Sequence, residues 1–336
     1  MSKVKIKTGM LLIILPLIVI FIALFMGRYP LPIPLVAEIL WAKLTLGASG
    51  VPLKYETIVW DIRLPRAILG ALVGASLAVS GAAFQGLFRN PLVSSGILGV
   101  SAGSGFGAAL AIVLFNSTAH IYLFAFCFGG IAVLLSIMVG SIYNTTPTIM
   151  LVLGGVIISS VFSALLSFLK YVADPYNQLP TIVFWLMGSM ASVRYQDITI
   201  AGLPMVIGLA GLFAVRWRLN VLSMGDKEAL SLGINTKLNK GLIIFCATLA
   251  TAGAVCVSGI IGWVGLVIPH IARMLVGNDN RLVIPTSMSL GACFLTFVDT
   301  LGRTITGSEI PLGILTALVG GPFFVYLLKK TKGKGW

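Results

Sequence analysis

Long apolar runs recur along this chain, and they limit its fold more than any other feature. The run from Met10 to Met26 is the first of them. Apolar runs of roughly 17–25 residues indicate membrane-spanning helices. Lipid offers the backbone no hydrogen-bond partners, so only helices or closed barrels span it, and barrel strands would be alternating segments of about ten residues. The runs therefore predict an all-α, polytopic membrane protein.

The apolar runs divide into about ten expected transmembrane helices. The first follows Lys3, Lys5 and Lys7, as in a signal peptide, but it is long and lacks a small-x-small cleavage site, so we interpret it as retained. Glycine is abundant, with 38 residues among 336, and small residues let membrane helices pack closely. Gly or Pro residues interrupt the third and eighth helices, which are expected to be short or broken. The approximate bounds are 9–27, 65–87, 94–115, 121–140, 148–169, 198–217, 241–261, 263–276, 283–302 and 311–328.

Basic residues are distributed unevenly between the loops, which predicts an orientation. Ten spans place both termini on one side, and cytoplasmic loops carry an excess of Lys and Arg. Cytoplasmic termini put most of the 23 basic and few of the 10 acidic residues inside. We therefore expect a multi-pass protein of the cytoplasmic (inner or plasma) membrane with both termini cytoplasmic. The excess of basic residues on the cytoplasmic side, next to the lipid bilayer, accounts for nearly all of the net charge of +13. No nucleic-acid partner is therefore expected.

Two stretches of the chain resemble each other. VSGAAFQGLFRNP, from Val79 to Pro91, and VSGIIGWVGLVIP, from Val257 to Pro269, share their first three residues and their last. In the expected topology they cross the membrane in opposite directions, and inverted repeats of this kind build transporters. We interpret residues 1–336 as a single transmembrane permease domain with inverted-repeat halves of about 60–170 and 240–330.

A polar segment, 223–240, separates two apolar runs in a chain that is only 10% charged. Its sequence, SMGDKEALSLGINTKLNK, suits a helix, and the expected topology places it in the largest cytoplasmic loop. A short amphipathic helix held between two spans can transmit a displacement to both. A solvated loop has a similar composition, and spacing alone leaves both interpretations open.

Five blocks of sequence together resemble a known family. They are DIRLPRAILGALVGASLAVSGAAFQGLFRNPL, GILGVSAGSGFG, GDKEALSLGI, GWVGLVIPHIARMLVG and PLGILTALVGGPFFVYLL. In this order, over about residues 10–330, they resemble permease subunits of type II ABC importers, which take up ferric siderophores, haem and vitamin B12. The resemblance implies a fold like that of the vitamin B12 importer permease. It also implies a second permease copy or a paralogue, two ATPase subunits and an extracytoplasmic substrate-binding protein.

The resemblance implies that this subunit catalyses nothing and binds no cofactor directly, with ATP on a partner subunit. The sequence contains no G-x-x-x-x-G-K-[ST] phosphate loop. The polar segment would be the ATPase-coupling helix, formed by Gly225, Asp226, Lys227, Glu228, Ala229, Leu230, Leu232 and Gly233. Arginines at the outer mouth would dock the binding protein through its carboxylates, namely Arg63, Arg66 and Arg303. Snorkelling, or pairing with Asp61 or Asp299 in the same chain, is the alternative for these arginines.

A cytoplasmic gate and a pathway lining are also implied by the resemblance. The gate residues would be Asn90, Pro91, Leu92, Thr145 and Thr146, and helix capping is their alternative role. Small and polar residues of the second and fifth spans would line the pathway, namely Ser76, Ser80, Gln85, Ser159, Ser160 and Ser163. No metal site is expected, because the cysteines form no CxxC and the two histidines lie far apart.

Two ionisable residues within the spans need an account. His270 could relay protons, but a structural role is favoured because it has no charged partner on its helix. Asp299 is the one acid placed well inside a span, and Arg303, one turn further on, is its expected partner.

Three functions compete for this sequence. We expect an importer permease for a metal chelate, most simply an iron(III)-siderophore, with haem, cobalamin and molybdate as alternative cargoes. A secondary transporter driven by an ion gradient would need more intramembrane acids than Asp299. A membrane-embedded enzyme would need clusters of His or acidic residues, and none is visible.

Overall fold

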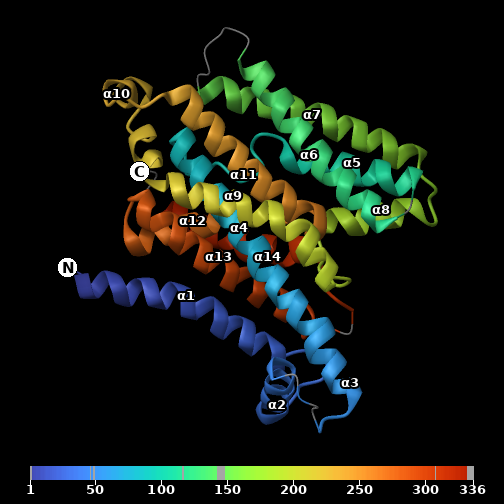
Figure 1. Ribbon diagram of the computed structural model, residues 1–336. Coiled ribbons are helices and arrows are strands. Elements are labelled where there is room, and N and C mark those ends of the chain that lie inside the picture. The colour runs from blue at the N-terminus through green and yellow to red at the C-terminus, as the bar shows by residue number, and fades with distance from the viewer. Residues whose placement is uncertain are drawn as a thin grey trace.

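The computed structural model describes residues 2–45, 47, 50–115, 117–141, 148–306 and 308–330, and within these ranges the chain forms helices and no strand. The predicted all-α class is confirmed (Figure 1). The elements are α1 (Ser2–Phe25), α2 (Ile33–Leu44), α3 (Leu53–Glu56), a π-helical segment η1 (Thr57–Arg63), α4 (Leu64–Phe88), α5 (Val100–Leu114), α6 (Thr118–Gly140), α7 (Thr148–Val172), α8 (Gln178–Met187), α9 (Tyr195–Leu222), α10 (Asp226–Ser231), α11 (Thr236–Ser258), α12 (Val264–Val276), α13 (Asn280–Gly302) and α14 (Leu312–Lys330).

The ten predicted helices correspond to α1, α4 to α7, α9 and α11 to α14. The sequence pattern did not indicate α2, α3, η1 and α8, because each has 12 residues or fewer and falls below the length of a span. The short helix α10 lies in the polar segment, where a helix was expected. Length and composition qualify six described segments as candidate spans, so the expected count of about ten is not confirmed directly. The six are Leu53–Phe88, Thr118–Gly140, Thr148–Val172, Tyr195–Leu222, Thr236–Ser258 and Asn280–Gly302.

Helix α4 runs through the middle of the bundle and is buried along nearly its whole length. Glycine brings its backbone against two neighbouring helices. A Cβ atom at Gly74 would overlap the carbonyl oxygen of Gly291 in α13, and one at Gly81 would overlap that of Gly265 in α12. The abundance of glycine therefore has the predicted consequence at these crossings, which is direct packing of one backbone on another.

Helices α5, α6 and α7 form a second group beside α11 (Figure 1). Gly103 and Gly107 of α5 lie against the backbone of α6, where a Cβ would overlap the carbonyl oxygens of Phe128 and Phe124. The Ser136 hydroxyl of α6 donates to the carbonyl of Leu98, 2.9 Å away, before α5. Helix α5 is short, as the glycines in its sequence led us to expect.

The two similar stretches of sequence lie against each other. The first is the end of α4, and the second leaves α11, passes a break and enters α12. Besides the Gly81–Gly265 crossing, the Gln85 side-chain amide donates to the carbonyl of Leu266 at 3.3 Å. The two stretches therefore share one interface, whereas the division of the domain into inverted halves stays a prediction.

Candidate coupling and translocation sites

The polar segment folds into a short helix, α10, held between α9 and α11. Gly225 precedes it with a backbone φ of 137°, and Gly233 follows it with a φ of 77°, conformations that favour glycine. The ammonium group of Lys240 in α11 lies 2.7 Å from the carboxylate of Asp226, which ties the start of α10 to α11. Ala229 is fully buried in the core that includes α9 and α11 side chains. Helix α10 is thus attached to both neighbours.

Apolar side chains project outward around α10. Leu230 and Leu232 are 59% and 60% exposed, and Met224 and Leu238 are just as open. We call these four residues the coupling surface. The sequence placed Ala229 with the two leucines among the coupling residues, but Ala229 packs into the core of its own chain.

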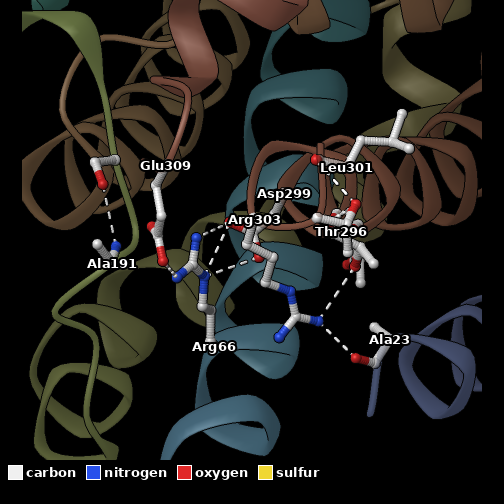
Figure 2. Close-up of polar contacts among 11 residues, drawn as sticks. Ala23, Arg66, Ala191, Thr296, Asp299, Leu301, Arg303 and Glu309 are labelled. Carbon is white, nitrogen blue, oxygen red and sulfur yellow. Dashed lines mark hydrogen bonds and ion pairs between the residues drawn. The ribbon is translucent and has the colours of Figure 1, made fainter. Parts of the chain in front are cut away.

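Three charged residues from distant parts of the sequence meet at one end of the bundle (Figure 2). Arg66 donates through Nε and Nη2 to both carboxylate oxygens of Asp299, at 2.8–3.0 Å, and through Nη1 to Glu309 at 2.8 Å. Asp299 is 2% exposed. The expected pairing of Asp299 with Arg303 is wrong, because Asp299 faces Arg66 of α4 whereas the Arg303 guanidinium turns toward α1.

The other two docking candidates hold the end of α1. Arg63 donates to the carbonyls of Leu24 and Tyr29, at 2.7 and 2.6 Å, and Arg303 donates to that of Ala23 at 2.5 Å. The last carbonyls of a helix have no donor within it, so these guanidinium groups complete the C-terminus of α1. All three candidate arginines are buried. The structure therefore places them in contacts within the chain, and their docking role stays a prediction.

The candidate gate follows α4 directly. The side-chain oxygen of Asn90 accepts a hydrogen bond from the backbone N–H of Leu92, 2.9 Å away, which is the local turn that Asn favours. Pro91 is half-buried and Leu92 is exposed. Thr145 and Thr146 lie outside the described residues. The gate role stays a prediction for all five.

A polar cavity of about 250 Å³ connects the gate loop with the coupling segment. Arg273 of α12 donates to the Gln85 side chain at its wall, and Ser223, at the end of α9, is on the same wall. The loop after α4 and the end of α9 therefore border the same cavity. The lining residues are Gln85, Gly86, Arg89, Asn90, Pro91, Ser223, Arg273, Asn278 and Asn280.

The six residues expected to line the pathway separate into two sets. Ser76, Ser80 and Gln85 are buried between helices of this chain, and the Ser80 hydroxyl donates to the carbonyl of Ala247 at 3.1 Å. The three serines of α7 instead border an open hollow of about 660 Å³. Sequence analysis missed the opposite wall, although the GILGVSAGSGFG block holds part of it. The hollow is lined by Ser94, Gly96, Ile97, Ser101, Val156, Ser159, Ser160 and Ser163.

In the part of the chain that the structure describes, no group of three or more His, Cys, Asp or Glu residues could hold a metal ion. His270 is buried on α12, three residues before Arg273. Cys246 and Cys256 are buried as expected of core cysteines, whereas Cys127 is exposed on α6.

Six of the described segments are long and apolar enough to cross a membrane, so the fold defines a polytopic membrane protein. The model of the FecCD transport family matches residues 13–330. The chain therefore belongs to the FecCD transport family, and it is an ABC importer permease, a subunit of the translocation pathway.

Relatives match almost the entire length. The chain is 40% identical to the molybdate import system permease protein MolB of Haemophilus influenzae, over 99% of this chain and 98% of that protein. It is 43% identical to a probable iron chelatin transport system permease protein of Helicobacter pylori, over 82% and 83%. A solved structure of a metal-chelate type ABC transporter in an inward-facing conformation has a TM-score of 0.87 and 38% identity, covering 96% of this chain and 99% of that one.

Proposed function

We propose that this chain moves a metal chelate, most simply an iron(III)-siderophore, across the cytoplasmic membrane, powered by separate ATPase subunits. The coupling surface carries this proposal, because exposed leucines on a helix tied to both α9 and α11 form an apolar patch that needs a partner. The iron chelatin permease and the metal-chelate transporter among the relatives support the cargo class.

Molybdate is the second cargo candidate. A relative that matches 99% of this chain is a molybdate permease, and haem and cobalamin permeases match over more than 80% of this chain. Specificity would lie in the extracytoplasmic binding protein. The shared chemistry of these cargoes is a large or charged solute that must pass without being retained, which suits the weakly polar serine-lined hollow beside α7.

Ten spans with both termini in the cytoplasm remain the proposed topology. Four further helices with shorter apolar segments would complete the ten spans, namely α1, α5, α12 and α14. The same topology puts α10 on the cytoplasmic side, where an ATPase subunit would bind it. A second permease copy or a paralogue would complete the pathway, and the ATP would stay on the partner subunits, with no cofactor on this chain.

Docking of a binding protein is proposed for the end of the bundle where Arg63, Arg66 and Arg303 lie. Each guanidinium would have to exchange its present partner for a carboxylate of the binding protein. The exchange is hardest for Arg66, because separating a buried ion pair leaves an uncompensated charge.

Reconstitution tests the proposed function. Proteoliposomes containing this chain, its ATPase subunit and its binding protein should accumulate ferric siderophore only when ATP is enclosed with the ATPase. Uptake driven by a proton or sodium gradient without the ATPase would identify a secondary transporter instead. Parallel assays with radioactive molybdate, haem and cobalamin decide the cargo, and exclusive uptake of molybdate would replace the siderophore assignment.

A further inference from the structure

An apolar cleft lies outside the sites described above. Helix α1 runs along one side of the bundle (Figure 1), and the cleft, of about 1080 Å³, lies between it and helices α4, α9 and α13. Leu12 and Pro16 of α1 face Leu72 of α4, Phe213 of α9 and Met288 of α13 across it. A volume at the top of the range of about 300–1,000 Å³ for small-molecule pockets leaves room for a substantial apolar ligand.

The cleft exists because α1 is anchored at one end only. Ala23 and Leu24 are buried there, and their carbonyls accept the hydrogen bonds from Arg303 and Arg63. Toward the other end α1 is exposed, and a Cβ atom at Gly9 would meet nothing within 4 Å. In a membrane, such a space between one helix and its bundle must be filled by lipid or protein.

One end of the cleft is basic. Phe213 lines it, and the guanidinium carbon of Arg216 lies 3.8 Å from the centre of the Phe213 ring. Leu282 also lines it, and its neighbour Arg281 has a side chain that is 62% exposed and pairs with Asp279. Arg216 is therefore a cation beside the end of the cleft where the phosphate of a lipid would lie.

We propose that this cleft is a binding site for an anionic phospholipid, with an acyl chain between α1 and the bundle and the phosphate at the basic end near Arg216. The proposal needs only the membrane location of the chain, so it is independent of the cargo. A transmembrane helix of a second copy is the alternative occupant, and the experiment below distinguishes it from a lipid.

A matched pair of glycine substitutions tests the site. Gly9 lines the cleft and Gly130 on α6 does not, and a Cβ at either meets nothing within 4 Å. The purified full-length chain is incubated with phosphatidylglycerol or with phosphatidylcholine of the same acyl chains, and retained lipid is counted by native mass spectrometry. Gly9→Trp should lower retention of phosphatidylglycerol by about tenfold, equivalent to about 1.4 kcal/mol, whereas Gly130→Trp should retain it as the parent does.

A second pair tests the headgroup. Arg216→Gln should remove the preference for phosphatidylglycerol over phosphatidylcholine, and Arg28→Gln, an exposed cation at the opposite end of α1, should keep it. Thermal unfolding of each variant monitors its fold, and Ala71→Leu in the cleft replaces Gly9→Trp if that variant does not fold. Equal lipid retention by the cleft variant and Gly130→Trp would overturn the proposal. The proposal would also be overturned if the cleft variant dissociated a permease dimer but retained as much lipid as the parent, because a second copy would then occupy the cleft.

Discussion

At the residue scale, Arg66 and Asp299 illustrate how an apolar bundle accommodates charge. Both side chains are buried, and the two-pronged geometry satisfies most of the polar atoms that burial removes from water. The sequence drew attention to both residues as charges near or within spans. Pairing with Asp299 was one alternative given for the outer arginines, and Arg66 has it. Arg303 was nevertheless expected as the partner of Asp299, because spacing along one helix reveals neighbours on that helix but not the side chains of another.

Removal of the acidic partner should destabilise the fold strongly. Asp299→Asn leaves the buried Arg66 without its main counter-charge, which typically costs about 3–5 kcal/mol. Thermal unfolding in detergent measures the loss. Glu309→Gln is the matched control, because Glu309 contacts the same guanidinium but its side chain is 38% exposed, so the change should be about 0–1 kcal/mol. Equal shifts in the two variants would contradict the assigned pairing.

Charge reversal tests the docking role of the arginines. Arg63→Glu combined with Arg66→Glu should weaken binding of the extracytoplasmic protein by about tenfold or more, because attraction to its carboxylates becomes repulsion. Pull-down of the binding protein at low salt measures the effect. Association with the ATPase subunit, measured on the same sample, reports whether the variant is folded. Unchanged docking with intact ATPase association would limit these arginines to their contacts with α1, Asp299 and Glu309.

At the element scale, the long helices follow from the sequence and the short ones do not. An apolar run of the length of a span predicts a helix whatever its neighbours are. Helices α2 and α8, with 12 and 10 residues, carry no such signal. Helix α10 is an intermediate case. Its polar composition marked the segment, whereas the burial of Ala229 and the exposure of Leu230 depend on how α9 and α11 hold it.

Polar substitution of the coupling surface should disconnect the ATPase. Leu230→Asp combined with Leu232→Asp places two charges where an apolar interface is proposed, so ATPase binding should fall by at least about tenfold and ATP-driven uptake with it. Co-purification and uptake into proteoliposomes measure the two effects. Ser231→Asp adds a charge to an exposed position on the same helix and serves as the control. Unchanged ATPase binding and uptake in the double variant would exclude α10 as the site that contacts the ATPase.

At the scale of the whole molecule, the arrangement of the helices positions distant residues together. Glycines at the crossings of α4 with α12 and α13 bring backbones into contact, and the two VSG stretches share an interface there. The cavity between the gate loop and the end of α9 depends on the same packing. These features place the loop after α4 beside the end of α9, next to the coupling segment.

The proposed topology is tested by labelling from each side. Lys227→Cys on α10 should react with a membrane-impermeant maleimide only when the cytoplasmic face is accessible, because Lys227 is exposed on the coupling segment. Arg28→Cys, exposed after α1, should react only from the outside. Oriented and inverted vesicles provide the two faces, and the unmodified chain with its four cysteines measures background labelling. Labelling of Lys227→Cys from the exterior would show that the orientation is the reverse of the proposed one.

The sequence by itself determined the helical membrane class and the positions of the long helices, because the absence of water in the bilayer leaves an apolar run no other fold. It also located the coupling segment, since charge is rare in this chain. Only the tertiary structure decided which buried groups are partners, which serines face an open hollow, and that α1 encloses a cleft. Those outcomes depend on which helix faces meet, and contacts between helices are a property of packing that periodicity along one helix does not encode.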